Sequence, residues 1–274
     1  MANMLGTLFV TSADGTRIAF DRLGEGPPLI LVSGLLCTRR TMTALAHRLA
    51  QQFTVINYDR RGRGDSSDTV PYAVEREVED LGALIAAAGG AASIYGHSSG
   101  AGLALRAAAA GLPITRLVLH EPPYGPDDGA SKESARQLAV QVEAALADGR
   151  LSEAIGLFFE ASGLPPETAM ALGQDPARVA VASTMAYDFA VMGDVSRGGT
   201  IPEPLVRAIT VPTLILAGGN SPLFFQDTAT AIAELLVNGQ LKVLDGQDHG
   251  APADAVAPVV AAFVAAGHSQ EARQ

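Results

Sequence analysis

The sequence of 274 residues contains no tryptophan, one cysteine, and 19 lysines and arginines against 29 aspartates and glutamates. The single cysteine, Cys37, cannot form an intramolecular disulfide, so nothing in the chain requires an oxidising compartment. We interpret Cys37 as a small buried residue. The formal net charge of −10 argues against nucleic acid as a partner, because phosphate backbones are bound through clustered lysine and arginine.

Long apolar runs are missing as well. No stretch approaches the roughly 18 consecutive apolar residues of a membrane helix. The first residues lack a charged segment followed by an apolar core, which would mark a secretory signal. We therefore expect a cytoplasmic protein that does not bind membranes. Clustered histidine and aspartate ligands and glycine-rich dinucleotide loops are also absent, so neither a metal nor a cofactor is expected.

The composition, 48% hydrophobic, is ample for a sizeable core. Two β-prone runs, residues 7–10 and 16–22, flank a turn signal and predict an antiparallel hairpin. The later runs are continuously apolar, as strands covered on both faces must be. They lie at residues 29–32, 54–58, 92–95, 117–120, 212–217 and 241–244, and helical patterns at 40–50, 73–88, 227–236 and 252–266 separate or follow them. This alternation predicts an α/β fold with a doubly wound, mostly parallel sheet.

One long segment interrupts the alternation. Residues 122–205 contain no convincing strand, and glycine and proline breakers divide them into helical stretches at 132–148, 151–161, 165–172 and 176–192. We predict an inserted helical cap at 122–205 and an α/β core formed by residues 1–121 and 206–274, with a frayed tail at 268–274.

The sequence Gly96-His97-Ser98-Ser99-Gly100 joins a predicted strand to an alanine-rich helix. A serine in a sharp strand-to-helix turn is a nucleophile elbow, whose glycines allow the strand and helix to approach closely. We predict that Ser98 is a nucleophile and that the N–H of Ser99 faces the oxyanion. In a chain with 29 glycines the Gly-x-Ser-x-Gly pattern can arise by chance, so the prediction depends on the strand and helix that flank it.

Four motifs in this order resemble the α/β-hydrolase superfamily. They are Ser33-Gly34, where the family usually has His-Gly, the loop Tyr58-Asp59-Arg60-Arg61-Gly62-Arg63-Gly64-Asp65-Ser66, the elbow at Ser98, and Gly246-Gln247-Asp248-His249. The resemblance implies an esterase-like or lactonase-like member with a serine nucleophile and a cap. It also implies that the N–H of Leu35 is the second oxyanion donor. The loop after Tyr58 invites a phosphate-binding interpretation, but the resemblance makes it structural, with Asp59 and one arginine in a local ion pair.

His249 follows the last predicted strand and is the candidate general base, since a neutral imidazole there could take the proton of Ser98. The alternative is an ordinary histidine of a surface loop. Of the other histidines, His47 lies in a helix and His268 in the tail. His97 flanks Ser98, so its side chain should point away from the nucleophile, and for His120 we favour a structural role.

The resemblance also implies an acid that completes a triad with Ser98 and His249. By resemblance it usually follows the strand after the cap, but Gly218-Gly219-Asn220-Ser221-Pro222 holds no carboxylate there. Asp227 falls at the predicted start of a helix, where an N-terminal cap is the better interpretation. Asp248 is a neighbour of His249, and adjacent residues rarely face each other. We predict Glu121, directly after the strand 117–120, where some superfamily members place their acid, with a surface glutamate and Asp227 as alternatives.

A serine nucleophile suits acyl transfer, so the expected substrate is an ester, lactone, thioester or activated amide, or a carbon–carbon bond next to a carbonyl. The pocket candidates are Phe158 and Phe159 of the cap and Phe224 after the next strand. They predict a small hydrophobic substrate, unless they are only the core of the cap. Two other functions stay open on the same fold, a non-hydrolytic biosynthetic enzyme for cyclisation or decarboxylation and a small-molecule receptor.

Overall fold

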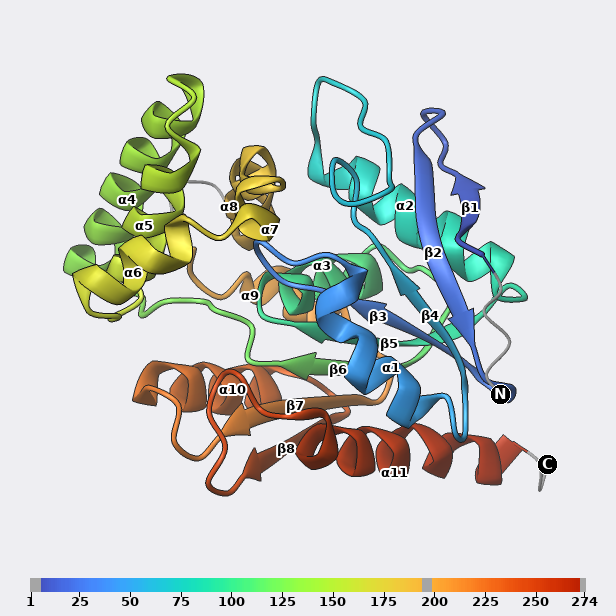
Figure 1. Cartoon of the computed structure of the whole chain (residues 1–274). Helices are drawn as coiled ribbons and strands as arrows, with labels where there is room; N and C mark the ends of the chain where they lie inside the picture. The colour runs from blue at the N-terminus through green and yellow to red at the C-terminus, as the bar shows by residue number, and fades with distance from the viewer. Residues whose placement is uncertain (1–5, 194–198, 272–274) are drawn as a thin grey trace.

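The computed structural model describes residues 6–193 and 199–271, the last five by their backbone alone. One eight-stranded sheet runs through the molecule, with helices on both faces and further helices beyond one end (Figure 1). The strands are β1 (Leu8–Thr11), β2 (Arg17–Leu23), β3 (Pro28–Val32), β4 (Thr54–Tyr58), β5 (Ala92–His97), β6 (Ile114–His120), β7 (Thr213–Gly218) and β8 (Gly239–Leu244).

The strand order is β1-β2-β4-β3-β5-β6-β7-β8. Strands β1 and β2 form the predicted hairpin, and β2 also pairs antiparallel with β4. The other pairings are parallel. The prediction of a doubly wound, mostly parallel sheet is therefore confirmed.

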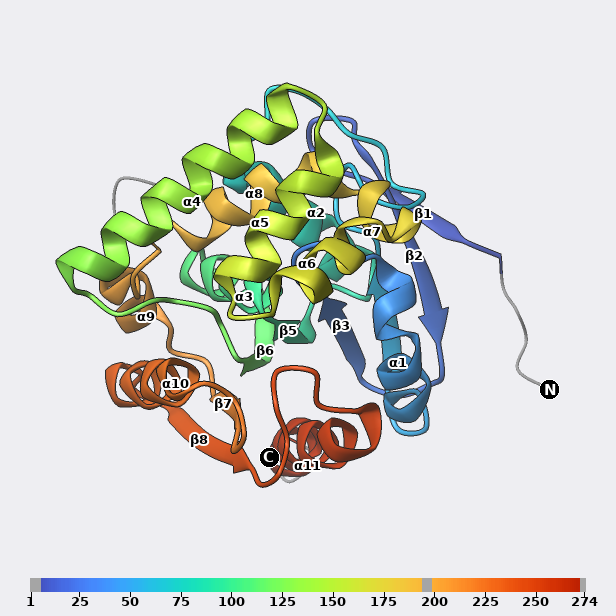
Figure 2. The ribbon, with the colours of Figure 1, turned by 60° about the vertical axis from the view of Figure 1, so that its left-hand side comes forward.

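The parallel strands are apolar on both faces because each face is covered by helices. In β3, Ile30 packs with α2 (Val74–Ala87) and α3 (Ser99–Ala109), while its neighbour Leu31 packs with α1 (Thr43–Leu49) and α11 (Ala253–Glu271). Successive residues of a strand point to opposite faces, so one short run contributes to two cores. Figure 2 separates these layers, with α1 and α11 on one side of the sheet and α3 with α10 (Leu223–Leu235) on the other.

The chain between β6 and β7 forms α4 (Gly129–Ala147), α5 (Leu151–Ala161), α6 (Pro166–Gly173), α7 (Pro176–Val179) and α8 (Met185–Met192). We refer to these helices as the cap. They lie beyond the end of the sheet toward which the parallel strands run (Figure 1).

The predicted single helix at 176–192 is wrong, because a 3₁₀ turn (Ala182–Thr184) separates α7 from α8. The hydroxyl of Thr184 donates to the carbonyl of Val181 at 2.8 Å, a local bond that competes with the helical ladder. Other limits differ from the prediction as well, for example that of β6, which begins at Ile114 and not at residue 117. Helix α10 begins directly after Pro222, and α11 extends into the expected tail as far as Glu271, while residues 272–274 of that tail lie outside the described residues.

Helix α9 (Glu203–Ala208) has no counterpart in the sequence analysis. Its Val206, together with Ile209, packs in the same cluster as the sheet and α3. The division at residue 205 therefore falls within a helix that packs against the core, and the limits of the two units stay a prediction.

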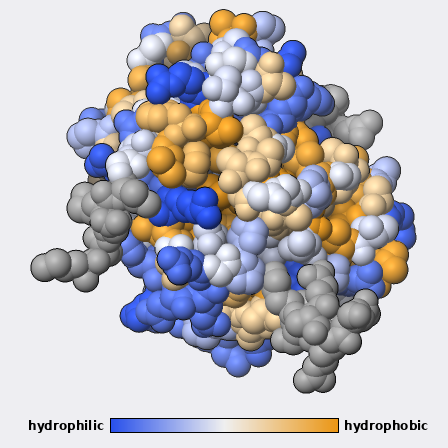
Figure 3. All heavy atoms as spheres, turned by 90° about the vertical axis from the view of Figure 1, so that its right-hand side faces the viewer, coloured by the Kyte–Doolittle hydropathy of each residue, from blue (hydrophilic) through white to orange (hydrophobic). Residues whose placement is uncertain are grey.

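Strand β1 forms one edge of the sheet, on the side that Figure 3 faces. Its Leu8 and Phe9 are partly exposed, and the guanidinium of Arg17 lies 4.2 Å above the Phe9 ring. Figure 3 shows apolar side chains on this face interrupted by polar ones, as is typical of protected sheet edges. Among the described residues no helix is long and apolar enough to cross a bilayer.

Candidate active site

Ser98 lies at the junction of β5 and α3 with φ 56° and ψ −131°, a conformation that L residues rarely adopt. The glycines on either side allow this turn. A Cβ at Gly96 would lie 2.5 Å from the carbonyl oxygen of Gly100, and a Cβ at Gly100 would lie 2.4 Å from that of Val32. The glycines are thus required by the close approach of α3 to β3 and β5, for the reason that the motif implied.

The loop after β3 lies against Ser98. A Cβ at Gly34 would be 2.9 Å from the Ser98 Cβ and 3.4 Å from its Oγ. The next residue is Leu35. Its backbone N–H finds no hydrogen-bond acceptor among residues 6–193 and 199–271. Ser99 is the first residue of α3, so its N–H has no partner within the helix. Gly34 and Ser98 lie in contact. The two predicted oxyanion donors, Leu35 and Ser99, are the next residues after them in the chain.

Glu121 follows β6 and is completely buried, with φ 48°. One carboxylate oxygen accepts the N–H of Gly218 at 2.6 Å, and the other lies 2.6 Å from Nδ1 of His249. Burial would raise the pKa of Glu121, but hydrogen bonds from His249 and Gly218 outweigh it and hold the pKa below its usual range. The structure thus joins the ends of β6 and β8 through one charged hydrogen bond.

The imidazole of His249 is packed between two rings. Phe225 of α10 stacks on it, with centroids 4.8 Å apart, and the ring of His97 lies at 4.7 Å. His97 Nε2 is 2.9 Å from the backbone oxygen of His249. Because a carbonyl can only accept, this nitrogen carries the proton. The side chain of His97 therefore supports the His249 loop.

His120 is buried beside this group, and its Nδ1 lies 2.7 Å from the Tyr95 hydroxyl. Burial lowers the pKa of His120 to about 4, and burial with two neighbouring histidines lowers the pKa of His97 well below its usual value. Both imidazoles are consequently neutral around pH 7.

The two other candidate acids are exposed. Asp227 lies in the second turn of α10, whose N-cap residue is Pro222, so the interpretation of Asp227 as a helix cap is wrong. The helix starts earlier than predicted, at Leu223, and its first turn buries Phe225, which a start at Asp227 would leave outside the helix. Asp248 accepts the N–H of Gly250 at 2.9 Å.

The predicted pocket residues lie in two places. The ring centroids of Phe158 and Phe159 of α5 are 5.5 Å apart. Both side chains pack in an apolar cluster of the cap that also includes Leu35 and Leu36. The ring centroid of Phe224 lies 4.2 Å from that of Phe225, whose ring stacks on His249. The cap phenylalanines thus share a cluster with Leu35 and Leu36 of the loop after β3, and Phe224 lies near His249.

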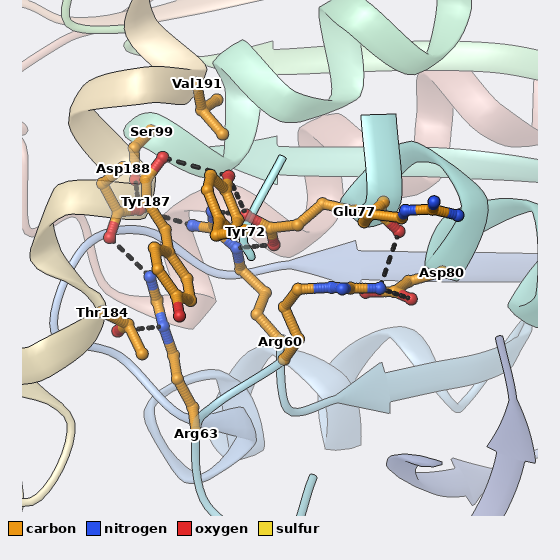
Figure 4. Close-up of polar contacts among 12 residues, drawn as sticks. Arg60, Arg63, Tyr72, Glu77, Asp80, Ser99, Thr184, Tyr187, Asp188 and Val191 are labelled. Carbon is orange, nitrogen blue, oxygen red and sulfur yellow. Dashed lines mark hydrogen bonds and ion pairs between the residues drawn. The ribbon is translucent and has the colours of Figure 1, made fainter. Parts of the chain in front are cut away.

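The arginines of the loop after β4 are fully buried and paired (Figure 4). Arg61 pairs with Asp80, whereas Arg60 and Arg63 pair with Asp188 of the cap. The prediction of a local ion pair for Asp59 is wrong, because Asp59 pairs with Arg39 from outside the loop, while the arginines of the loop pair with other carboxylates. The sequence analysis missed Asp188, although an aspartate within the apolar run of α8 is a signal that a buried partner exists.

Among the described residues no three histidine, cysteine, aspartate or glutamate side chains are grouped as ligands of a metal ion.

Comparison with known proteins gives three kinds of similarity. A sequence model of the Alpha/beta hydrolase family matches residues 29–262. The crystal structure of an alpha/beta hydrolase from Sphaerobacter thermophilus DSM 20745 is 48% identical, with a TM-score of 0.84, over 94% of this chain and 100% of that one. An esterase from Rhodococcus sp. ECU1013 is 25% identical, with a TM-score of 0.66, over 90% of this chain and 92% of that one.

The N-formylmaleamate deformylase of Pseudomonas putida KT2440 is 41% identical over 117 residues, which are 41% of this chain and 44% of the deformylase. The chain therefore spans less than half the length of this curated relative.

Proposed function

Because this chain belongs to the alpha/beta hydrolase family, we propose that it is a serine hydrolase that cleaves an ester, lactone or related acyl bond of a small hydrophobic substrate. The observation that carries the proposal is the 2.6 Å hydrogen bond between Nδ1 of His249 and buried Glu121. It orients the imidazole so that Nε2 is available as a base, and it stabilises the imidazolium that forms.

In the proposed reaction the Ser98 oxygen attacks the carbonyl carbon of the substrate while His249 Nε2 takes the hydroxyl proton. The tetrahedral oxyanion accepts hydrogen bonds from the N–H groups of Leu35 and Ser99. Collapse breaks the bond to the leaving group, which takes the proton from His249. Water then loses a proton to His249 and attacks the acyl-Ser98 ester, so the acid is released and Ser98 regains its proton.

Within the described residues no hydrogen bond joins the Ser98 hydroxyl to His249. Such bonds often tighten only when substrate is bound, so the proposal assigns this contact to the enzyme–substrate complex.

Substrate preference is assigned to the apolar side chains around the site. Phe158 and Phe159 pack with the oxyanion-loop residues Leu35 and Leu36, and Phe224 lies beside the ring that stacks on His249. A pocket lined by such side chains favours an apolar acyl or alcohol group. In the proposal the cap supplies Phe158 and Phe159 of this lining, and the core supplies the rest.

A second candidate substrate class is an N-formyl amide. The 41% identity to N-formylmaleamate deformylase over 117 residues favours it. The same steps apply, with the amide nitrogen taking the proton from His249 as it leaves.

The test combines covalent labelling with a substrate panel. Wild-type protein and Ser98→Ala are treated with a fluorophosphonate probe, and both are assayed on p-nitrophenyl esters, lactones and N-formyl amides of varied chain length. We expect labelling and hydrolysis in the wild type and neither in Ser98→Ala, with the circular dichroism spectrum unchanged. Activity that survives in the folded variant would falsify the role of Ser98. A folded wild type that resists the probe and cleaves none of the panel would instead indicate a receptor or a non-hydrolytic enzyme.

A further inference from the structure

A buried group of charged side chains joins cap helix α8 to the loop after β4 (Figure 4). Arg60 and Arg63 each donate to a different oxygen of Asp188, at 2.5 Å, and the hydroxyl of Ser99 donates to Asp188 at 2.7 Å. Glu77 accepts two further bonds from Arg60 at 2.7 Å, so two cations face two anions. All of these residues are at most 2% exposed, and buried charges persist only when they are paired in this way.

Arg63 also holds the peptide that carries one predicted oxyanion donor. It donates to the carbonyl of Gly34 at 2.7 Å and to that of Cys37 at 3.3 Å. The Gly34 carbonyl and the Leu35 N–H belong to one planar trans peptide, so they point in opposite directions. With the carbonyl fixed on Arg63, the Leu35 N–H is fixed away from Arg63.

The other predicted donor is connected to the same carboxylate. Ser99 is bound to Asp188 through its side chain, while its N–H is the donor at the start of α3. Asp188 therefore contacts one donor residue directly and reaches the other through Arg63.

The cap holds the same loop by a second, apolar contact. Leu36 has φ 58°, which is unfavourable for an L side chain, and it is 8% exposed. It packs with Ile155 of α5 and Met185 of α8. Strained backbone of this kind persists only where its surroundings fix it.

We propose that Asp188 is a positioning residue that assembles the oxyanion hole, so that the hole is complete only when α8 is docked. This inference rests on the proposed function, because it assigns the role of donors to Leu35 and Ser99. Asp188 acts through Arg63 and Ser99 and does not touch the substrate.

The first test is Asp188→Asn, which keeps the size of the side chain but replaces one acceptor oxygen by a donor. Arg63 loses its acceptor if the amide nitrogen replaces Oδ2, whereas Arg60 and Ser99 lose theirs if it replaces Oδ1. Loss of an oxyanion donor costs about 10²–10³ in kcat, and for a misplaced donor we expect a fall of about 10- to 100-fold. KM should stay within about threefold, because the ground state uses the donors little. Affinity for a trifluoromethyl ketone, which forms an oxyanion with Ser98, should fall by the same factor as kcat.

Asp80→Asn is the matched control. Asp80 is 1% exposed like Asp188, and it accepts two bonds from Arg61 of the same loop, at 2.8 and 2.7 Å. The further bonds of Arg61 go to Asp14 and to the carbonyl of Arg76, outside the oxyanion loop. We expect a similar decrease in Tm, but a kcat and a ketone affinity within about threefold of the wild type when assayed well below Tm.

Arg63→Lys decides the matter if Asp188→Asn does not fold, because it keeps the charge but cannot reach Gly34, Thr184 and Asp188 together. It should show the same loss of kcat and ketone affinity. If the wild type is active and the folded Asp188→Asn and Arg63→Lys variants have its kcat, the inference is overturned but the proposed function is not. The same holds if Asp80→Asn loses as much kcat as Asp188→Asn. A wild type that hydrolyses nothing in the panel overturns the proposed function and this inference together.

Discussion

At the scale of single residues, Glu121 has two tasks, one for its backbone and one for its carboxylate. Its backbone turns the chain out of β6 with a positive φ, and its buried carboxylate receives one N–H from Gly218 and one from His249. Each carboxylate oxygen has its own hydrogen-bond donor, so both oxygens are needed.

We predict that Glu121→Gln lowers kcat by roughly 10⁴, the cost of an acid-to-amide change in a comparable triad. The amide has one acceptor oxygen for two donors, so either Gly218 or His249 faces an NH₂ group. Asp227→Asn, on the exposed side of α10, should change kcat less than about tenfold. Steady-state rates on one p-nitrophenyl ester compare the two variants, and a reversed order would place the acid after β7.

At the scale of elements, the elbow depends on how closely α3 approaches the sheet. We predict that Gly100→Ala lowers the free energy of unfolding by about 1–3 kcal/mol, since the added Cβ meets the carbonyl oxygens of Val32 and Ser33 at 2.4 and 2.6 Å. Gly82→Ala in α2 is the matched change. Its Cβ meets only Leu112, at 3.7 Å, so it should raise stability by about 0.5–1 kcal/mol. Urea denaturation measures both, and equal effects would contradict the proposed close approach.

The cap phenylalanines are expected to act on substrate choice. We predict that Phe158→Ala lowers kcat/KM for long-chain esters by about tenfold while acetate esters change less than about threefold, because remote contacts act on binding and positioning. Val140→Ala on α4, with its side chain 60% exposed, is the control and should leave the chain-length profile unchanged. A uniform loss over all chain lengths in Phe158→Ala would assign this residue to the cap core only.

The elements that the sequence predicted best are the parallel strands, because a strand covered on both faces must be continuously apolar. Strand β4 matches its predicted limits, and β3 differs by one residue. The break between α7 and α8 was missed because it depends on the side chain of Thr184, which bonds to the backbone and to Arg63. The pairing of Arg63 with Asp188 was out of reach for a different reason, since the two residues are 125 positions apart.

The whole molecule carries a pH dependence that comes from its buried histidines. Burial lowers the pKa of His120 to about 4 and that of His97 well below 6.5, whereas an unfolded chain protonates both near pH 6.5. Below about pH 6.5 the unfolded state therefore binds more protons than the folded state. The stability that these groups contribute is complete above pH 6.5 and is lost as the pH falls toward 4.

We predict that the free energy of unfolding decreases by up to about 1.4 kcal/mol per pH unit for each of these histidines between pH 6.5 and pH 4. Chemical denaturation at intervals of half a pH unit measures the slope. His120→Asn should make the slope shallower, and His47→Gln, at an exposed position of α1, should leave it unchanged. A stability that is flat over this range would mean that the two imidazoles are protonated in the fold.

The ion pairs of Asp188 also limit how this protein can be recombined or can evolve. Arg60 and Arg63 belong to the segment before β5, and Asp188 belongs to the segment between β6 and β7. A chimera that received residues 122–205 from another hydrolase would bury the Arg63 guanidinium without its counter-ion and would leave Arg60 with Glu77 alone, and an uncompensated buried charge is strongly destabilising. A graft must therefore bring a carboxylate to this place, or the host must give up Arg63. In related sequences we expect Arg60, Arg63 and Asp188 to change together. The helical insert is then compatible only with a core that carries the matching charges.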